Sequence, residues 1–252
     1  MLLKMRLLTA AALLACCGSD LARAQSGVRP PSANDARQGS SEQRPAADDD
    51  ALKAEQACEQ ARAHAARGAD RAPEARKEFA RGVMIYLRVY TKERPRARDA
   101  AVQTAFRERM RVRLKGAPRC VEDYLALGRG GTPFEREQLE AFGGQVSMLI
   151  EADEARAVLL GQEVDQPARI MRKPEPGFTE AARRNNVRGM VRLRAVLASD
   201  GAVRHVLVLE GLPFGMTEEC VAAAKGIRFT PAVKNGRPVS QFVMLEYNFS
   251  TY

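Results

Sequence analysis

Few side chains in this sequence have both the type and the spacing that catalysis or metal binding requires. There are two histidines, His64 and His205, and neither has a cysteine or carboxylate at a ligand-like spacing. The motifs of a phosphate-binding loop, a dinucleotide-binding turn and a serine nucleophile elbow do not occur. We therefore expect no metal, no cofactor and no enzymatic activity.

Cys220 is the side chain that a thiol enzyme would use as its nucleophile. It stands in the stretch MTEECVAAAKG, where Cys220, Val221 and Ala224 share the apolar face of an expected helix. This position predicts a small core residue, whereas a thiol hydrolase or oxidoreductase would need Cys220 exposed beside a base. The enzyme hypothesis therefore ranks below a binding or structural function.

The N-terminus has the features of an export signal. Residues 1–24 combine a basic start, an apolar run that is too short to span a bilayer, and the sequence Ala22-Arg23-Ala24, which suits a signal peptidase. In a second interpretation Leu13 to Cys16 is a lipoprotein box, and Cys16 is acylated and anchored to a membrane. Both place the protein in the periplasm, so we do not expect nucleic acid as a partner in spite of the net charge of +9.

Export changes the interpretation of the remaining cysteines. Cys58 and Cys120 both lie in the central region of the chain, and in an oxidising compartment they predict a disulfide. The chain-entropy model assigns about 4 kcal/mol to the closure of such a loop. Two buried, reduced thiols are the alternative.

The segments before the C-terminal region differ in composition. Residues 25–50 are rich in Pro, Ser, Gly and Asp, which predicts a disordered linker. Residues 51–163 have apolar side chains at three- and four-residue spacing, which predicts an all-α domain of four to six helices. One stretch of it alternates five basic residues, which we interpret as a solvated helix surface with local ion pairs: Arg107, Arg109, Arg111, Arg113 and Lys115.

The periodicity changes in residues 164–252. Apolar and polar side chains alternate from Val191 to Leu197, and Asp200-Gly201 is a hairpin turn before a return strand. A helix with Thr217 as its cap follows, and Val239 to Phe249 is the last strand. We expect a small α+β domain with a three-stranded antiparallel sheet and two helices, preceded by the all-α domain and the disordered tether.

An ordered set of residues between 172 and 249 resembles the C-terminal domain of the energy transducer TonB. The matching positions are Phe178, Gly189, Val191, Asp200-Gly201, Val203, Arg228-Phe229, Pro231-Ala232, Asn235-Gly236, Pro238 and Phe249. Thr179 and Ile227 stand where the family commonly has a proline and a tryptophan. The resemblance implies a domain that binds an extended segment of an outer-membrane receptor by strand addition and takes part in transmembrane transport.

The last strand is the expected docking edge, because an edge strand offers unpaired backbone groups. We expect its side chains to be core and its backbone to bind. The candidate partner-binding residues are Gln241, Val243, Leu245 and Tyr247 on this strand, with Phe178 and Arg228 outside it. The partner is a receptor segment, an envelope scaffold or a second copy of the chain. The alternative function is a structural subunit of an envelope or secretion complex with no energy-transducing role.

Overall fold

The computed structural model describes residues 46–92, 100–128, 131–151 and 157–250. The expected signal peptide, the Cys16 lipidation site and most of the expected linker lie outside these residues. Residues 46–252 form one compact unit. None of the helices in the described ranges is long and apolar enough to cross a membrane.

The N-terminal half of the described chain is helical. Five α-helices and a short 3-10 turn at Ala69–Arg71 occur there, in the order α1 (Ala46–Ala66), α2 (Ala72–Lys92), α3 (Ala100–Leu114), α4 (Ala117–Ala126) and α5 (Pro133–Ile150). Helix α1 begins at Ala46, within the segment expected to be a linker. Helix α5 begins with a capping box, in which Thr132 and Glu135 bond each other's backbone N–H groups.

A disulfide between Cys58 and Cys120 joins α1 to α4. Helix α2 passes close to it at Gly82, where an added Cβ would lie 2.4 Å from the Sγ of Cys58. Glycine is therefore required at that point of α2 for the three helices to pack together. The largest fully buried side chains of the helical region include Tyr86, Tyr90 and Phe142.

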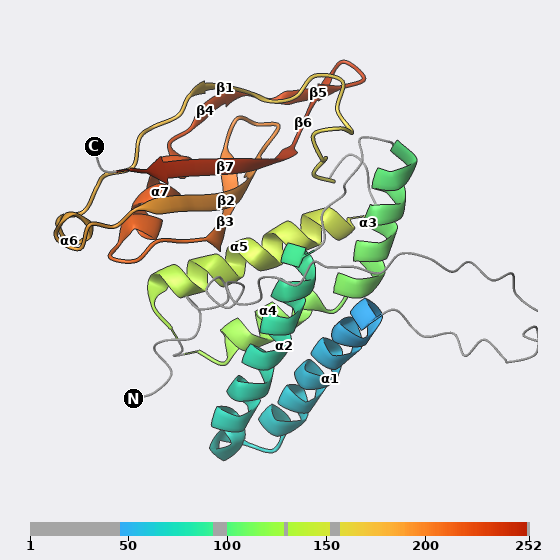
Figure 1. Cartoon of the computed structure of the whole chain (residues 1–252). Helices are drawn as coiled ribbons and strands as arrows, with labels where there is room; N and C mark the ends of the chain where they lie inside the picture. The colour runs from blue at the N-terminus through green and yellow to red at the C-terminus, as the bar shows by residue number, and fades with distance from the viewer. Residues whose placement is uncertain (1–45, 93–99, 129–130, 152–156, 251–252) are drawn as a thin grey trace, which may run out of the picture. The chain divides into compact units, whose positions relative to one another are not determined.

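The C-terminal half contains the expected α+β domain (Figure 1). Its elements are β1 (Arg169–Arg172), α6 (Glu180–Arg184), β2 (Gly189–Leu197), β3 (Val203–Glu210), α7 (Met216–Lys225), β4 (Arg228–Thr230), β5 (Ala232–Lys234), β6 (Arg237–Val239) and β7 (Gln241–Phe249). The three long strands form an antiparallel sheet in the order β3-β2-β7. The predicted fold class is therefore confirmed.

Two short ladders, β1-β4 and β5-β6, add to the expected sheet. Strand β1 was not expected from the sequence. All four of its residues are exposed, so it carries no alternating apolar signal. The expected cap of α7 is also different: the helix begins at Met216 after Gly215. Thr217 is buried instead, and its Oγ1 bonds the backbone N–H and C=O of Leu212 at 2.8 and 2.7 Å.

The two faces of the three-stranded sheet pack against different helices. Val191, Leu193 and Leu245 form a buried cluster with Cys220 and Val221 of α7. Val196, Leu207 and Phe242 belong instead to the core of the helical region. The sheet is therefore sandwiched between α7 and the helical array, which fixes its strands before any partner arrives.

Candidate functional site

Strand β7 is the last strand of the three-stranded sheet, so one of its edges has no long neighbouring strand (Figure 1). It pairs with β2 along its whole length, from Gly189 opposite Phe249 to Leu197 opposite Gln241. This pairing is regular and has no bulge. The outer edge of β7 is therefore straight and in a fixed register.

The contacts of Leu159 show which backbone groups of β7 point outward. The N–H of Phe242 donates to the carbonyl of Leu159, and the N–H of Leu159 donates to the carbonyl of Ser240, both at 2.9 Å. In an antiparallel strand, the groups that point to one side belong to every second residue. The N–H and C=O of Met244, Glu246 and Asn248 therefore point away from β2.

Two groups of the same chain already lie on this edge. Leu159 bridges to its first residue, Gln241. Further along, the Nζ of Lys173 donates to the carbonyl of Glu246 at 2.6 Å and lies 4.1 Å from the centroid of the Tyr247 ring. Within the described ranges, no strand pairs with the outward groups of Met244, Glu246 or Asn248. The open part of the edge thus begins after Phe242.

The opposite edge of the sheet, on β3, is covered by helix α5. The side-chain amide of Gln138 donates to the carbonyl of Val206 at 3.2 Å and accepts from the N–H of Val208 at 2.8 Å. This is the pairing that a neighbouring strand would make. The fully buried Gln145 of the same helix donates to the carbonyl of Arg194 at 2.8 Å and accepts from the hydroxyl of Tyr90 at 2.7 Å. The sheet therefore has one covered edge and one open edge.

The four candidate residues on β7 have inward-facing groups. Gln241, Leu245 and Tyr247 are buried, and Val243 is half-buried against the α7 cluster. By the alternation above, their N–H and C=O groups pair with β2. Sequence reasoning identified the strand, but the outward backbone groups belong to the residues between those it named.

The other two candidates, Phe178 and Arg228, are not residues of β7. Phe178 is half-buried and packs edge-to-face on Phe249, with ring centroids 5.8 Å apart. Thr179, which replaces the expected proline, caps α6 by accepting from the N–H of Ala182 and also donates to the carbonyl of Phe214 at 2.7 Å. Arg228 is exposed on β4, opposite Arg172 of β1.

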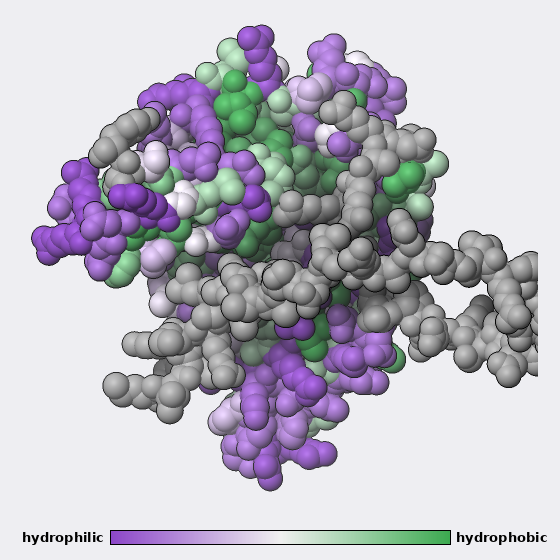
Figure 2. Space-filling model, in the orientation of Figure 1, coloured by the Kyte–Doolittle hydropathy of each residue, from purple (hydrophilic) through white to green (hydrophobic). Residues whose placement is uncertain are grey.

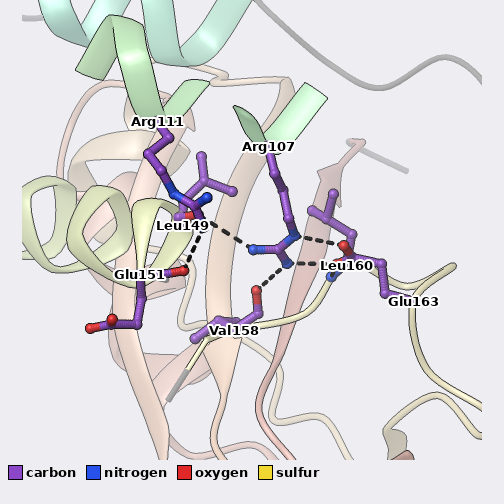
Figure 3. A network of polar contacts seen from close by, with 7 residues as sticks. All are labelled: Arg107, Arg111, Leu149, Glu151, Val158, Leu160 and Glu163. Atoms are coloured by element: carbon purple, nitrogen blue, oxygen red, sulfur yellow. Dashed lines mark hydrogen bonds and ion pairs between the residues drawn. The ribbon is translucent and has the colours of Figure 1, made fainter. Parts of the chain in front are cut away.

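An arginine on α3 fixes the segment that carries Leu159 (Figure 3). The guanidinium of Arg107 binds both carboxylate oxygens of Glu163 at 2.6 Å and donates to the carbonyl of Val158 at 2.5 Å. Only 12% and 14% of the Arg107 and Glu163 side chains are exposed. Arg111 donates to the carbonyl of Ile150 at 3.0 Å, at the end of α5, where a cation is favourable.

The basic run is therefore only in part the solvated surface that the sequence suggested: Arg109 and Lys115 are exposed, and Arg111 forms a local ion pair with Glu108. Arg107 and Arg111 hold the chain where it leaves α5, and Arg113 is buried. The spacing on the helix could not reveal this, because the bonded groups lie about forty to sixty residues further along the chain, beyond the range of any local pattern.

The surroundings of Cys220 and His205 bear on whether these side chains could take part in catalysis or metal binding. Burial raises the pKa of Cys220 to about 12, so its thiol stays protonated at neutral pH. Burial lowers the pKa of His205, with a further contribution from Arg204. Among the described residues, no group of three or more His, Cys, Asp or Glu side chains could hold a metal.

Comparisons with known proteins find matches to the C-terminal part of the chain. Residues 174–251 match the family described as "Gram-negative bacterial TonB protein C-terminal". No curated protein sequence matches the chain. The solution NMR structure of the TonB C-terminal domain from Pseudomonas aeruginosa is 25% identical over 35% of this chain and 92% of its own, with a TM-score of 0.29.

A TM-score this low does not establish a shared fold, so the sequence match carries the assignment. Strands β2 to β7 and helices α6 and α7 lie within the matched range, β1 lies just before it, and β7 is its last strand. The resemblance to the TonB C-terminal domain is therefore confirmed, because residues 174–251 of this chain match the model of that family.

Proposed function

We propose that this chain is a periplasmic, TonB-like protein that binds an extended segment of another envelope protein by adding it as a strand to β7. Through this binding it takes part in transport across the cell envelope. The family match supports a role in envelope transport and a protein as the partner. The chain acts as a docking protein in this account and not as an enzyme.

One observation carries the proposal: β7 has outward backbone groups in a fixed register with no strand beside them in the described chain. An edge of this kind is a template for strand addition, in which backbone hydrogen bonds supply affinity with modest demands on sequence. The covered edge on β3 cannot offer the same, because Gln138 already bonds Val206 and Val208. Of the two edges of the three-stranded sheet, β7 is therefore the one that the described chain leaves open.

Leu159 at one end of this edge, and the end of β7 at the other, limit the length of the added strand. Leu159 occupies the outward N–H of Phe242, so the incoming segment pairs from Met244 onward. It meets the backbone of Met244, Glu246 and Asn248, and each net hydrogen bond contributes about 1 kcal/mol. Its N–H opposite Glu246 replaces the ammonium of Lys173, which now occupies that carbonyl. A short segment of about five residues satisfies the open groups, since bonded pairs recur at every second residue.

Site-specific photo-crosslinking in living cells tests the proposal. Met244 is the position for the photoreactive residue, because its side chain is 42% exposed and its backbone lies on the open edge. Val112 on α3 is the matched control, being an exposed apolar residue of the helical region. We expect Met244 to capture the periplasmic segment of an outer-membrane receptor and Val112 to capture none.

The captured protein also separates the two candidate functions. Capture of an envelope scaffold or of a second copy of the chain at Met244 would replace the transport role with a structural one. Equal capture of the same protein at Met244 and Val112, or capture at neither, would contradict docking on β7.

A further inference from the structure

Charged residues are paired differently in the main sheet and in the two short ladders. On the main sheet, Arg192 lies opposite Glu210 on β3 and Glu246 on β7. It forms ion pairs with them at 3.3 and 3.0 Å. This is the arrangement expected where opposite charges stabilise neighbouring strands.

The short ladders place cations opposite cations. Arg172 of β1 lies directly opposite Arg228 of β4. Lys234 of β5 lies directly opposite Arg237 of β6. Like charges in these positions destabilise a ladder, and a ladder of three residue pairs has little other stabilisation to spare. An anion bound beside each pair would remove the repulsion.

The described part of the chain supplies a carboxylate near the second pair, and no ion pair to either. None of these four cations forms an ion pair with a described carboxylate, and neither does the exposed Arg169 of β1. Asp165 lies next to the β5-β6 turn, and its carboxylate accepts the N–H of Asn235 at 2.6 Å.

The two ladders form one continuous strip, which we call the basic ribbon and define as residues 166–172 and 228–239. Gln166 bridges to Val233, so the chain before β1 runs antiparallel to β5 in the same way that β1 runs antiparallel to β4. The ribbon therefore gathers five cations along two neighbouring stretches of backbone: Arg169, Arg172, Arg228, Lys234 and Arg237.

Exposed apolar side chains lie among these cations. Met171 is 65% exposed and Ile170 is 39% exposed. Figure 2 shows hydrophobic surface next to hydrophilic surface over the part of the view where β1 and β4 lie. Single exposed apolar side chains are common on protein surfaces, but these two are adjacent and stand between Arg169 and Arg172.

The combination of cations and apolar side chains fits an anionic lipid surface. Arginine and lysine bind lipid phosphates, while exposed apolar side chains enter the boundary between headgroups and acyl chains. An acidic protein would neutralise the cations too, but the charges alone would give it no reason to cover Met171 and Ile170. The lipid surface accounts for both observations.

We propose that the basic ribbon binds the anionic surface of a membrane. Arg172, Arg228 and Arg237 contact lipid phosphates, and Met171 inserts at the interface. Lys173 follows β1 directly and touches β7 at Glu246, so the ribbon adjoins the docking edge. Membrane binding would hold that edge beside the bilayer, but it does not depend on strand addition.

Co-sedimentation with lipid vesicles tests the proposal on the protein as the cell processes it. The probes are vesicles of phosphatidylcholine with one quarter phosphatidylglycerol, and vesicles of phosphatidylcholine alone. A triple variant carries Arg172→Gln, Arg228→Gln and Arg237→Gln. The matched control carries Arg67→Gln, Arg81→Gln and Arg88→Gln, which removes the same charge from exposed positions of the helical region. Any contribution of residues 1–45 is common to all variants.

Each basic residue at an anionic surface contributes roughly fivefold to the partition coefficient, so the ribbon variant should bind anionic vesicles about a hundredfold more weakly. The helical control should change by less than about threefold, because its arginines lie off the contact face. Met171→Ser should weaken binding roughly fivefold with no change of charge. The thermal midpoint of the ribbon variant should stay equal or rise, because two like-charge contacts are relieved.

Three results would overturn the proposal. One is the absence of binding to the anionic vesicles. Another is an equal loss in the two triple variants, which would show that net charge alone attracts the protein. The third is an unchanged affinity of the Met171→Ser protein together with capture of an acidic protein by the ribbon, which would assign the ribbon to a protein partner.

Discussion

A pair of proline substitutions on neighbouring residues of β7 tests the direction of its backbone groups. The N–H of Met244 points outward, and the N–H of Val243 pairs with β2, opposite Ala195. Proline removes the N–H and is tolerated in a strand only where that group faces solvent. Met244→Pro should therefore leave the sheet intact, whereas Val243→Pro should break the ladder.

The structure sets the expected magnitudes. Val243→Pro removes one ladder hydrogen bond and leaves a carbonyl of the central strand β2 without its partner, at a position where Ala195 is fully buried. An unsatisfied buried group costs about 1 to 3 kcal/mol, and the ring adds a steric cost within the ladder. Met244→Pro loses no internal bond, so its cost should stay below about 1 kcal/mol.

Urea denaturation of the two variants measures the difference. We expect the free energy of unfolding to fall at least about 2 kcal/mol further for Val243→Pro than for Met244→Pro. With the photoreactive residue moved to the exposed Asn248, the stable Met244→Pro protein should lose its partner in the cross-linking assay, because the outward donor of residue 244 is gone. Equal destabilisation by the two substitutions, or a larger effect of Met244→Pro, would refute the assigned alternation.

Three further predictions concern the scaffold. Removal of the disulfide by Cys58→Ser and Cys120→Ser together should lower the free energy of unfolding by about 4 kcal/mol, since the bond closes a separation of 62 residues; an unchanged urea midpoint would contradict it. Arg107→Ala leaves a largely buried carboxylate without its cation and should cost about 3 kcal/mol; the amide of Phe242 should then exchange faster, and unchanged exchange would show that the arginine does not hold Leu159 in place. Cys220 should resist alkylation in the native protein at pH 8 and react after unfolding, because burial raises its pKa to about 12; rapid native modification would show an exposed thiol.

Local patterns were sufficient for the main sheet. The alternation from Val191 to Leu197 and the Asp200-Gly201 turn predicted β2 and β3, and both are present. Val191, Leu193 and Ala195 of β2 are buried and alternate with half-buried residues, which leaves a period-two signal in the sequence. Helix α6 is one of the two helices expected in this domain, and Thr179 caps it in the structure.

The short ladders left no such signal. Strand β1 is exposed on both faces, and β4 is only three residues long. Their pairing depends on contacts between residues about sixty positions apart, which no local window contains. The like-charge pairs of the basic ribbon could be identified only after the register was known.

The proposed docking edge could be predicted only in part, because its details also depend on contacts between residues that are distant in the sequence. The sequence indicated the last strand as the candidate edge, since the resemblance implies strand addition to an edge of the sheet. The alternation of its backbone groups was not accessible, since it follows from the bond between Phe242 and Leu159. The segment of Leu159 in turn is held through Glu163 and Arg107, and the sequence suggested that Arg107 was part of a solvated helix surface.

Hydrogen exchange of the β7 amides, with and without the partner segment captured at Met244, tests the central claim most directly. Strand addition predicts that the amides of Met244, Glu246 and Asn248 become protected in the complex, because each donates to the new strand. The amide of Val208 should not change, because Gln138 already covers it. Protection at Val208 or elsewhere on the surface, with no change at Met244, Glu246 and Asn248, would contradict docking on β7.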